Sequence, residues 1–196
     1  MAQEQREFDM RRHHHRVSCL LAIALAASPL HAAPNTKLRI PAQARVGDTA
    51  VAAAQFEFTC TTGKGGALSV AAVLPPPEAV AEFPLERFEG PDGIGEAGKL
   101  ATWSVLGKRA MQASSAISGW RGVDGDGFLL ASSRDSGRKT DLGRLLNRWL
   151  RESRQPLWLE LRAPEGDAKL MVTALPDTRR AQLSAMLAPC LTQSRR

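Results

Sequence analysis

Paired acidic residues are the first candidates for chemistry, because two carboxylates can divide acid and base work between them. Asp124 and Asp126 stand two residues apart in an Asp-Gly-Asp-Gly segment. A calcium loop needs more oxygen ligands at alternate positions and a distal glutamate, which this segment lacks. A glycosidase pair needs carboxylates about 5–9 Å apart across a cleft, which neighbours in one turn rarely achieve. We therefore interpret the segment as a solvated hairpin turn, with a carboxylate-based hydrolase as an open alternative.

Two other segments approach known motifs without completing them. Ser136 and Lys139 have the S-x-x-K spacing of penicillin-binding enzymes, but no S-x-N motif follows, and Lys139-Thr140-Asp141 departs from the K-T-G motif of those enzymes. The Gly-Lys-Gly-Gly segment at 63–66 lacks the spacing and the hydroxyl residue of a phosphate-binding loop, so it is predicted to be a turn. We assign no catalytic residue, no metal ligand and no cofactor.

The N-terminal region has the pattern of a secretory signal peptide. A cationic segment, Met10–Arg16, precedes an apolar run, Val17–Ala27, and small residues follow. This order predicts a leader over residues 1–32 that is cleaved before Ala33. The apolar run is shorter than the roughly 20 residues that a membrane anchor needs, so a retained anchor is the less favoured alternative. Acidic residues stand before the cationic segment, which leaves open whether translation starts at its methionine or at the first one.

Removal of the leader changes the chemistry open to the mature chain. All four histidines precede the predicted cleavage site. A Ser-His-Asp or Cys-His site is then excluded, and histidine ligands for zinc or haem are missing. The sequence therefore favours a protein that is not an enzyme and that is periplasmic or secreted.

Two cysteines remain in the mature chain, Cys60 and Cys190. In an oxidising compartment, an even pair in a small domain most simply forms one disulfide. The alternating segment before Cys60 and the helical spacing before Cys190 each put the cysteine on an apolar face, so both should point inward. Two separate free thiols are the alternative.

Period-two patterns predict a mainly antiparallel β protein. Alternation over Gln55–Cys60 and Ala67–Leu74 predicts two buried strands joined by a glycine-rich turn. Residues 33–54 are predicted to form an extended N-terminal arm in which little packs. Four further strands are predicted, the first a short edge strand because it contains a proline: Phe83–Phe88, Leu100–Val105, Ile117–Val123 and Phe128–Ser133.

The hydrophobic period changes to 3.6 residues in the C-terminal half. Leucines and a tryptophan recur at helical spacing over Asp141–Arg154, and Thr140 or Asp141 supplies the N-cap. Alternation then returns over Leu157–Arg162 and Leu170–Leu175, which predicts a hairpin.

A second helix is predicted to begin after Asp177 or Thr178. Its apolar face consists of four residues at helical spacing: Leu183, Met186, Leu187 and Cys190. The chain is thus predicted to form one α+β domain over residues 55–196. This domain is an antiparallel sheet or sandwich with two helices in the C-terminal half and one disulfide.

Charge is distributed unevenly along the chain, whose formal net charge is +6. Residues 33–98 carry five Lys/Arg against eight Asp/Glu, whereas residues 99–196 carry seventeen against nine. The C-terminal half is therefore a basic region. Nucleic acid is disfavoured as its partner, because the protein is predicted to be exported and has no stacking-aromatic motif.

Part of this positive charge is concentrated around the first predicted helix. Arg144, Arg148 and Arg151 stand at i, i+4 and i+7 on the helix face opposite the leucines, so they should form one exposed ridge. Arg138 and Lys139 come just before the helix. We interpret these five residues as a candidate surface for an acidic partner, with an ordinary solvated helix face as the alternative.

The order of elements from Trp120 to Cys190 resembles small secreted proteins of the invasion-associated locus B type and the VasI (TagO) accessory proteins of type VI secretion. The matching features are the strand ending in Cys60, a strand at Phe128–Ser132, the leucine-rich helix, the hairpin and the terminal helix. The resemblance implies a non-enzymatic accessory role in the bacterial envelope and brings no catalytic residues.

These observations together predict an accessory protein of the Gram-negative envelope that works by binding an envelope or secretion-system protein. The mature chain should have no integral membrane span and no cofactor. A periplasmic immunity protein or enzyme inhibitor is the first alternative, and the carboxylate-based hydrolase is the second.

Overall fold

The computed structural model describes a set of segments in the chain: residues 36–62, 66–90, 100–106, 110–123, 127–135, 140–152, 155–174 and 179–191. All of them belong to one of the two compact units into which the chain divides, the unit Ala32–Arg196. The predicted signal peptide and the turn with Asp124 and Asp126 lie outside the described residues. Within the described segments, no helix has the length and apolar character to cross a membrane.

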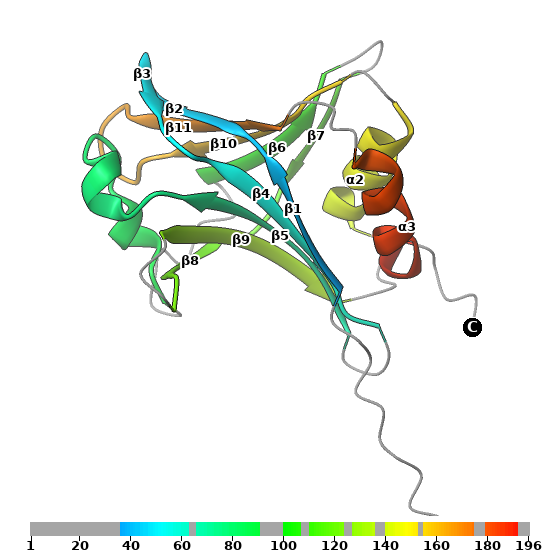
Figure 1. The fold of residues 1–196 in the computed structure, drawn as a ribbon. Coiled ribbons are helices and arrows are strands. Elements are labelled where there is room, and N and C mark those ends of the chain that lie inside the picture. The colour runs from blue at the N-terminus through cyan, green and yellow to red at the C-terminus, as the bar shows by residue number, and fades with distance from the viewer. Residues whose placement is uncertain are drawn as a thin grey trace, which may run out of the picture. The chain divides into compact units, whose positions relative to one another are not determined.

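Five antiparallel strands form the first sheet, in the order β1-β4-β5-β9-β8 (Figure 1). Their bounds are β1 Thr36–Pro41, β4 Gln55–Cys60, β5 Ala67–Leu74, β8 Ser118–Arg121 and β9 Phe128–Asp135. Strands β4 and β5 have the predicted bounds, and Phe56, Phe58 and Cys60 are buried together on one face, as alternation requires.

Six antiparallel strands form the second sheet, in the order β3-β2-β11-β10-β6-β7. Their bounds are β2 Gln43–Val46, β3 Thr49–Val51, β6 Ala101–Val105, β7 Met111–Ser114, β10 Leu157–Arg162 and β11 Lys169–Ala174. The predicted C-terminal hairpin is confirmed, because Leu157 pairs with Ala174 and Arg162 pairs with Lys169. Strand β7 was not predicted, since its sequence Met-Gln-Ala-Ser carries little β signal.

The expectation that little packs in the N-terminal arm is wrong. β1 pairs with β4 in the five-stranded sheet, and β2 pairs with β11 in the six-stranded sheet. Ile40, Ala44 and Val46 belong to the core. The strands carry small or isolated apolar residues on alternate positions, and they gain stability from partners far along the chain rather than from their own composition.

The predicted edge strand Phe83–Phe88 is also wrong. The chain instead forms two short 3-10 helices, η1 Pro77–Val80 and η2 Leu85–Phe88. Leu85 and Phe88 stand three residues apart, which places both on one side of a 3-10 turn, and both are buried. Phe83 stacks on Phe88 with ring centroids 5.8 Å apart, so this segment covers part of the core.

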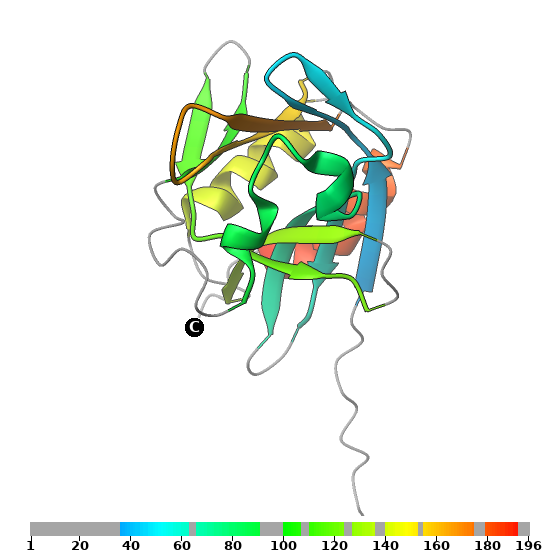
Figure 2. The same ribbon diagram turned by 90° about the vertical axis from the view of Figure 1, so that its left-hand side faces the viewer.

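The two sheets face each other across one hydrophobic core. Phe56 of β4 contacts Trp103 of β6, with ring centroids 5.6 Å apart. Along the described strands, the chain passes from one sheet to the other at five junctions: β1–β2, β3–β4, β5–β6, β7–β8 and β9–β10. Figure 2 shows the η1 and η2 segment in front and both α-helices behind, so these elements cover opposite sides of the core.

Two helices in the C-terminal half complete the predicted fold class, α2 Asp141–Arg151 and α3 Arg180–Leu191. Helix α2 contacts β6, β7 and α3, whereas α3 contacts β4 and β5, so the pair is supported by both sheets. Thr140 is the N-cap of α2, since its Oγ1 accepts a hydrogen bond from the backbone N–H of Gly143 at 3.2 Å. The buried face of α2 matches the prediction: Leu142, Leu145, Leu146 and Trp149.

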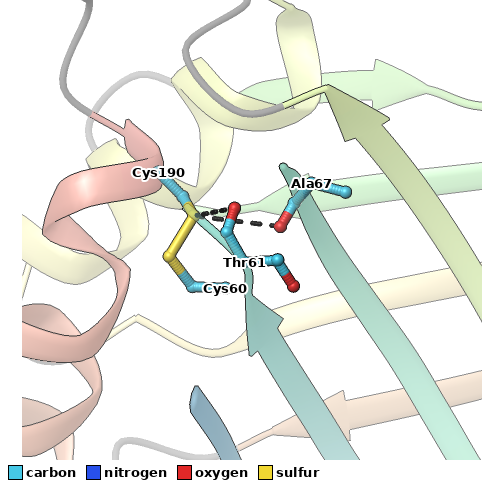
Figure 3. Close-up of a disulfide and its surroundings, with 4 residues drawn as sticks. All are labelled: Cys60, Thr61, Ala67 and Cys190. Carbon is cyan, nitrogen blue, oxygen red and sulfur yellow. Dashed lines mark hydrogen bonds between the residues drawn. A yellow bond between two sulfur atoms is a disulfide. The ribbon is translucent and has the colours of Figure 1, made fainter. Parts of the chain in front are cut away.

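The predicted disulfide Cys60–Cys190 is present, and it joins the end of β4 to the last turn of α3 (Figure 3). The sulfur of Cys190 lies 3.6 Å from the carbonyl oxygen of Thr61 and 3.8 Å from that of Ala67. A disulfide sulfur has no proton to donate, so these are packing contacts. Both half-cystines are buried, which fastens α3 to the sheet from inside the core.

Candidate binding surfaces

The arginines of α2 do not form the uniform exposed ridge that their spacing predicts. Arg144 and Arg151 are exposed, but the side chain of Arg148 is only 22% exposed. The Nε of Arg148 donates to Glu152 at 2.9 Å, and Arg144 pairs with Asp141 one turn earlier. The prediction is therefore wrong for Arg148, because Glu152 at i+4 draws its guanidinium along the helix.

The remaining candidate surface is what we call the arginine face, defined by Arg144 and Arg151. Arg151 has no carboxylate partner among the described residues, so its charge is available to a ligand. Arg138 and Lys139, which were predicted to extend the surface, lie outside the described residues.

Arg180 of α3 fixes the end of α2 in place. Its Nε donates to the carbonyl of Leu150 at 3.2 Å and its Nη2 to the carbonyl of Glu152 at 2.8 Å. The guanidinium carbon lies 5.3 Å from the centroid of the Trp149 ring, a cation–π contact. Burial lowers the pKa of Arg180. The last turn of α2 is thus capped by a cation, which holds the arginine face on a well-supported helix.

Two clusters of charge elsewhere serve to join elements. Glu57 of β4 is nearly buried and pairs with Lys37 at 2.9 Å and Arg39 at 2.7 Å, both on β1. Burial raises the pKa of Glu57, but the hydrogen bonds and charges of its two partners lower it more, so the net shift is downward. These pairs attach the edge strand β1 to the five-stranded sheet.

Arg121 of β8 makes a similar connection to the 3-10 helices. Its Nη1 lies 3.0 Å from Glu78 of η1, and its Nη2 lies 3.8 Å from Glu86 of η2. The hydrogen bond to Glu78 raises the pKa of Arg121. The pKa of Glu78 is lowered by a hydrogen bond from its own backbone and by Arg121. Because these ion pairs join β8 to both 3-10 helices, we assign them a structural role.

A groove of about 740 Å³ lies on the outer face of the six-stranded sheet. Its floor comes from the outward positions of β10 and β11, where Trp158 pairs with Thr173 and Met171 follows on the same face. The hairpin of β2 and β3 forms one side and Pro156 lines the groove beyond Trp158. The volume lies within the range of about 300–1,000 Å³ that is typical of small-molecule sites.

The sequence patterns did not predict this groove. Trp158 and Met171 are apolar residues on the outward phase of a hairpin whose inward phase is already filled by leucines, alanine and valine. Large apolar residues on the outward face of a hairpin indicate a surface site, and this signal was present in the sequence. The rest of the groove depends on the β2–β3 hairpin, which lies in the segment predicted to be an arm.

The described residues contain no group of three or more His, Cys, Asp or Glu side chains placed to hold a metal ion. Comparison of the chain with protein-family models, curated proteins and solved structures finds no match. The function is therefore inferred from the surfaces of this chain.

Proposed function

We propose that this protein is a non-enzymatic accessory protein of the Gram-negative envelope, exported to the periplasm or beyond, which acts by binding an acidic protein. The observation that carries the proposal is the arginine face. Arg144 and Arg151 project to solvent from a helix whose opposite face is buried in the core. Positive side chains on a fixed helix attract and orient a negatively charged partner.

The way α2 is held supports this role. Its N-terminus is capped by Thr140, its C-terminus by Arg180, and its apolar face packs against β6, β7 and α3. A surface on such a helix loses little conformational entropy when a partner binds. The arginine face is therefore better suited to recognition than charges on a loop would be.

The disulfide supports the proposed location, because such bonds form and persist in oxidising compartments. It also agrees with the signal pattern before Ala33. N-terminal sequencing of protein recovered from the periplasmic fraction or the medium is expected to begin at Ala33, since small residues precede that position. A mature species that retains the apolar run Val17–Ala27 would contradict the proposed export route.

Charge reversal of the arginine face tests the binding function. The variant Arg144→Glu/Arg151→Glu is expected to lose capture of the partner in a pull-down from envelope extract, because like charges then face each other across the interface. Its melting temperature should stay near that of the wild type, since exposed ion pairs contribute only about 0–1 kcal/mol.

The matched control is Arg162→Glu/Lys169→Glu, which changes the net charge equally on the exposed cross-strand pair of β10 and β11. This control should capture the same protein as the wild type does. Equal capture by both double variants would contradict the proposal, and so would equal loss in both, because net charge alone would then explain binding.

A further inference from the structure

The floor of the groove on the six-stranded sheet consists of two rows of outward side chains. Gln43, Thr173 and Trp158 lie opposite one another on β2, β11 and β10, which are adjacent strands (Figure 1). Arg45 lies opposite Met171 in the next row. Strands in a sheet are about 4.8 Å apart and successive rows on one face about 7 Å apart, so a single small ligand can contact both rows.

The part of Trp158 that reaches the groove is its carbon ring system. The residue is half-buried and lines the groove, whereas its Nε1 is buried. A ligand therefore meets an aromatic surface without the indole donor. Met171 and Pro156, which are also half-buried, extend this apolar surface. Such a surface attracts flat groups of C–H bonds through dispersion and through the charge distribution of the ring.

Polar side chains around this apolar surface offer both donors and acceptors. Gln43 carries an amide and Thr173 a hydroxyl group, and each of these groups can donate and accept. Arg45 only donates and Asp48 only accepts. Gln43, Arg45 and Asp48 are exposed, so they can turn toward a ligand. A ligand with many hydroxyl groups matches this set, because every hydroxyl both donates and accepts.

The charges beside the groove cancel. Among the described residues that line it, Arg45 and Asp48 are the two charged ones, one of each sign. Beyond Met171 on the same outer face, Glu160 pairs with Arg162 at 3.1 Å, so that pair adds no net charge. A charged ligand would be attracted by one lining residue and repelled by the other. The groove therefore favours a neutral ligand.

The wall of the groove is fixed by the backbone. β2 pairs with β11 on one side and with β3 on the other. At the base of the β2–β3 hairpin, the N–H of Ala42 donates to the carbonyl of Ala54 at 3.0 Å. At its tip, the N–H of Gly47 donates to the carbonyl of Lys169 at 3.2 Å. A wall held at both ends loses little conformational entropy when a ligand binds.

We propose that this groove binds a neutral saccharide made of glucose-type rings. Such a ring has two flat faces of C–H bonds and a rim of hydroxyl groups. One face lies on Trp158 and Met171, and the rim exchanges hydrogen bonds with Gln43, Arg45 and Asp48. This site is separate from the arginine face, which consists of residues on α2, so either proposal can fail without the other.

The test uses the whole exported protein and cellotriose, a neutral beta-linked glucose trimer. Isothermal titration calorimetry is expected to show saturable binding. Saturation-transfer difference NMR should give its strongest signals from the C–H protons of one ring face. The corresponding trimers of glucosamine and glucuronic acid have the same linkage with charges of opposite sign, and both should bind at least about fivefold more weakly.

Variants of Trp158 test the stacking contact. Trp158→Ala should weaken cellotriose binding at least about tenfold, because the aromatic surface is lost. Trp158→Phe should stay within about threefold of the wild type, since a ring remains and the buried Nε1 does not contact the ligand. The matched control is Trp120→Ala, which removes an exposed tryptophan from β8 of the other sheet and should bind as the wild type does.

A second pair of variants tests the polar rim and does not disturb the apolar floor. Gln43→Ala should weaken binding about fivefold, because the amide is exposed and serves the ligand rather than the fold. Gln55→Ala is the matched control, an exposed glutamine on β4 that does not line the groove. It should bind as the wild type does, and circular dichroism should show that all variants are folded.

Absence of saturable cellotriose binding by the folded wild type would overturn the proposal. Unchanged affinity in both Gln43→Ala and Trp158→Ala would overturn it, and should Trp158→Ala not fold, unchanged affinity in Gln43→Ala would do so. Equal or tighter binding of either charged trimer would remove the preference for a neutral ligand and have the same consequence. A wild-type dimer in sedimentation that Trp158→Ala dissociates would assign the groove to a second copy of the chain instead.

Discussion

Replacing both half-cystines, in the variant Cys60→Ser/Cys190→Ser, is expected to lower the free energy of unfolding by about 4–5 kcal/mol. The bond closes a loop with a sequence separation of 130 residues, and a cross-link of that length removes much of the conformational entropy of the unfolded chain. The effect is near the total stability of a small domain, about 5–15 kcal/mol. Urea titration of the oxidised wild type and the double variant measures it.

The control for this prediction is a reductant, which should destabilise the wild type and leave the double variant unchanged. The companion variant Cys60→Ala/Cys190→Ala separates the loss of the bond from the cost of burying two hydroxyl groups. Thiol titration of denatured wild-type protein from the periplasm should find neither cysteine free. Two reactive thiols in that titration, or equal urea midpoints for wild type and both variants, would contradict the prediction.

Truncation of Trp149 to alanine should have an effect of similar size, a loss of about 3–5 kcal/mol. The side chain is almost fully buried and stacks on Phe58 of β4, with ring centroids 5.7 Å apart. It also donates to the carbonyl of Gln155 and supports the guanidinium of Arg180. Alanine leaves a cavity between α2 and the five-stranded sheet and removes both polar contacts. Urea or thermal unfolding of the oxidised protein provides the measurement.

The matched control is Trp120→Ala, which removes the same side chain from β8, where it is 43% exposed. Its cost should be well below that of Trp149→Ala, because less apolar surface leaves water when it folds. Trp149→Phe should recover part of the lost stability, since a ring remains to stack on Phe58. Equal losses for the two alanine variants would mean that α2 is not held to the sheet through Trp149.

Sequence patterns predicted the elements that bury large apolar residues at a regular period. Alternation identified β4, β5 and the β10–β11 hairpin, and the 3.6-residue period identified α2 and the inward phase of Cys190. In each case, the period is visible because one face carries leucine, valine or phenylalanine and the other does not. The disulfide was predicted from that phase together with the expected oxidising compartment.

The elements that were missed or misassigned depend on partners distant in sequence. Strand β2 is stabilised by pairing with β11, and strand β7 is stabilised by packing against α2. Neither strand therefore needs a strong alternating hydrophobic pattern of its own. The same limit applies to the candidate sites. Helical spacing placed Arg148 on the correct face of α2, but its partial burial depends on the ion pair with Glu152. The groove exists only because the β2–β3 hairpin lies beside Trp158.

The long separation between Cys60 and Cys190 also has a consequence for the order of folding. β2 pairs with β11 across a similar stretch of chain, with Ala44 opposite Val172. Neither closure can form until the chain beyond residue 170 has been made. Strand β2 must therefore wait with one open edge, because β3 covers only its other side, and contacts of such high sequence separation make folding slow. A domain of this topology exposes apolar surface throughout that interval, so aggregation competes with folding until the last strand and helix are in place.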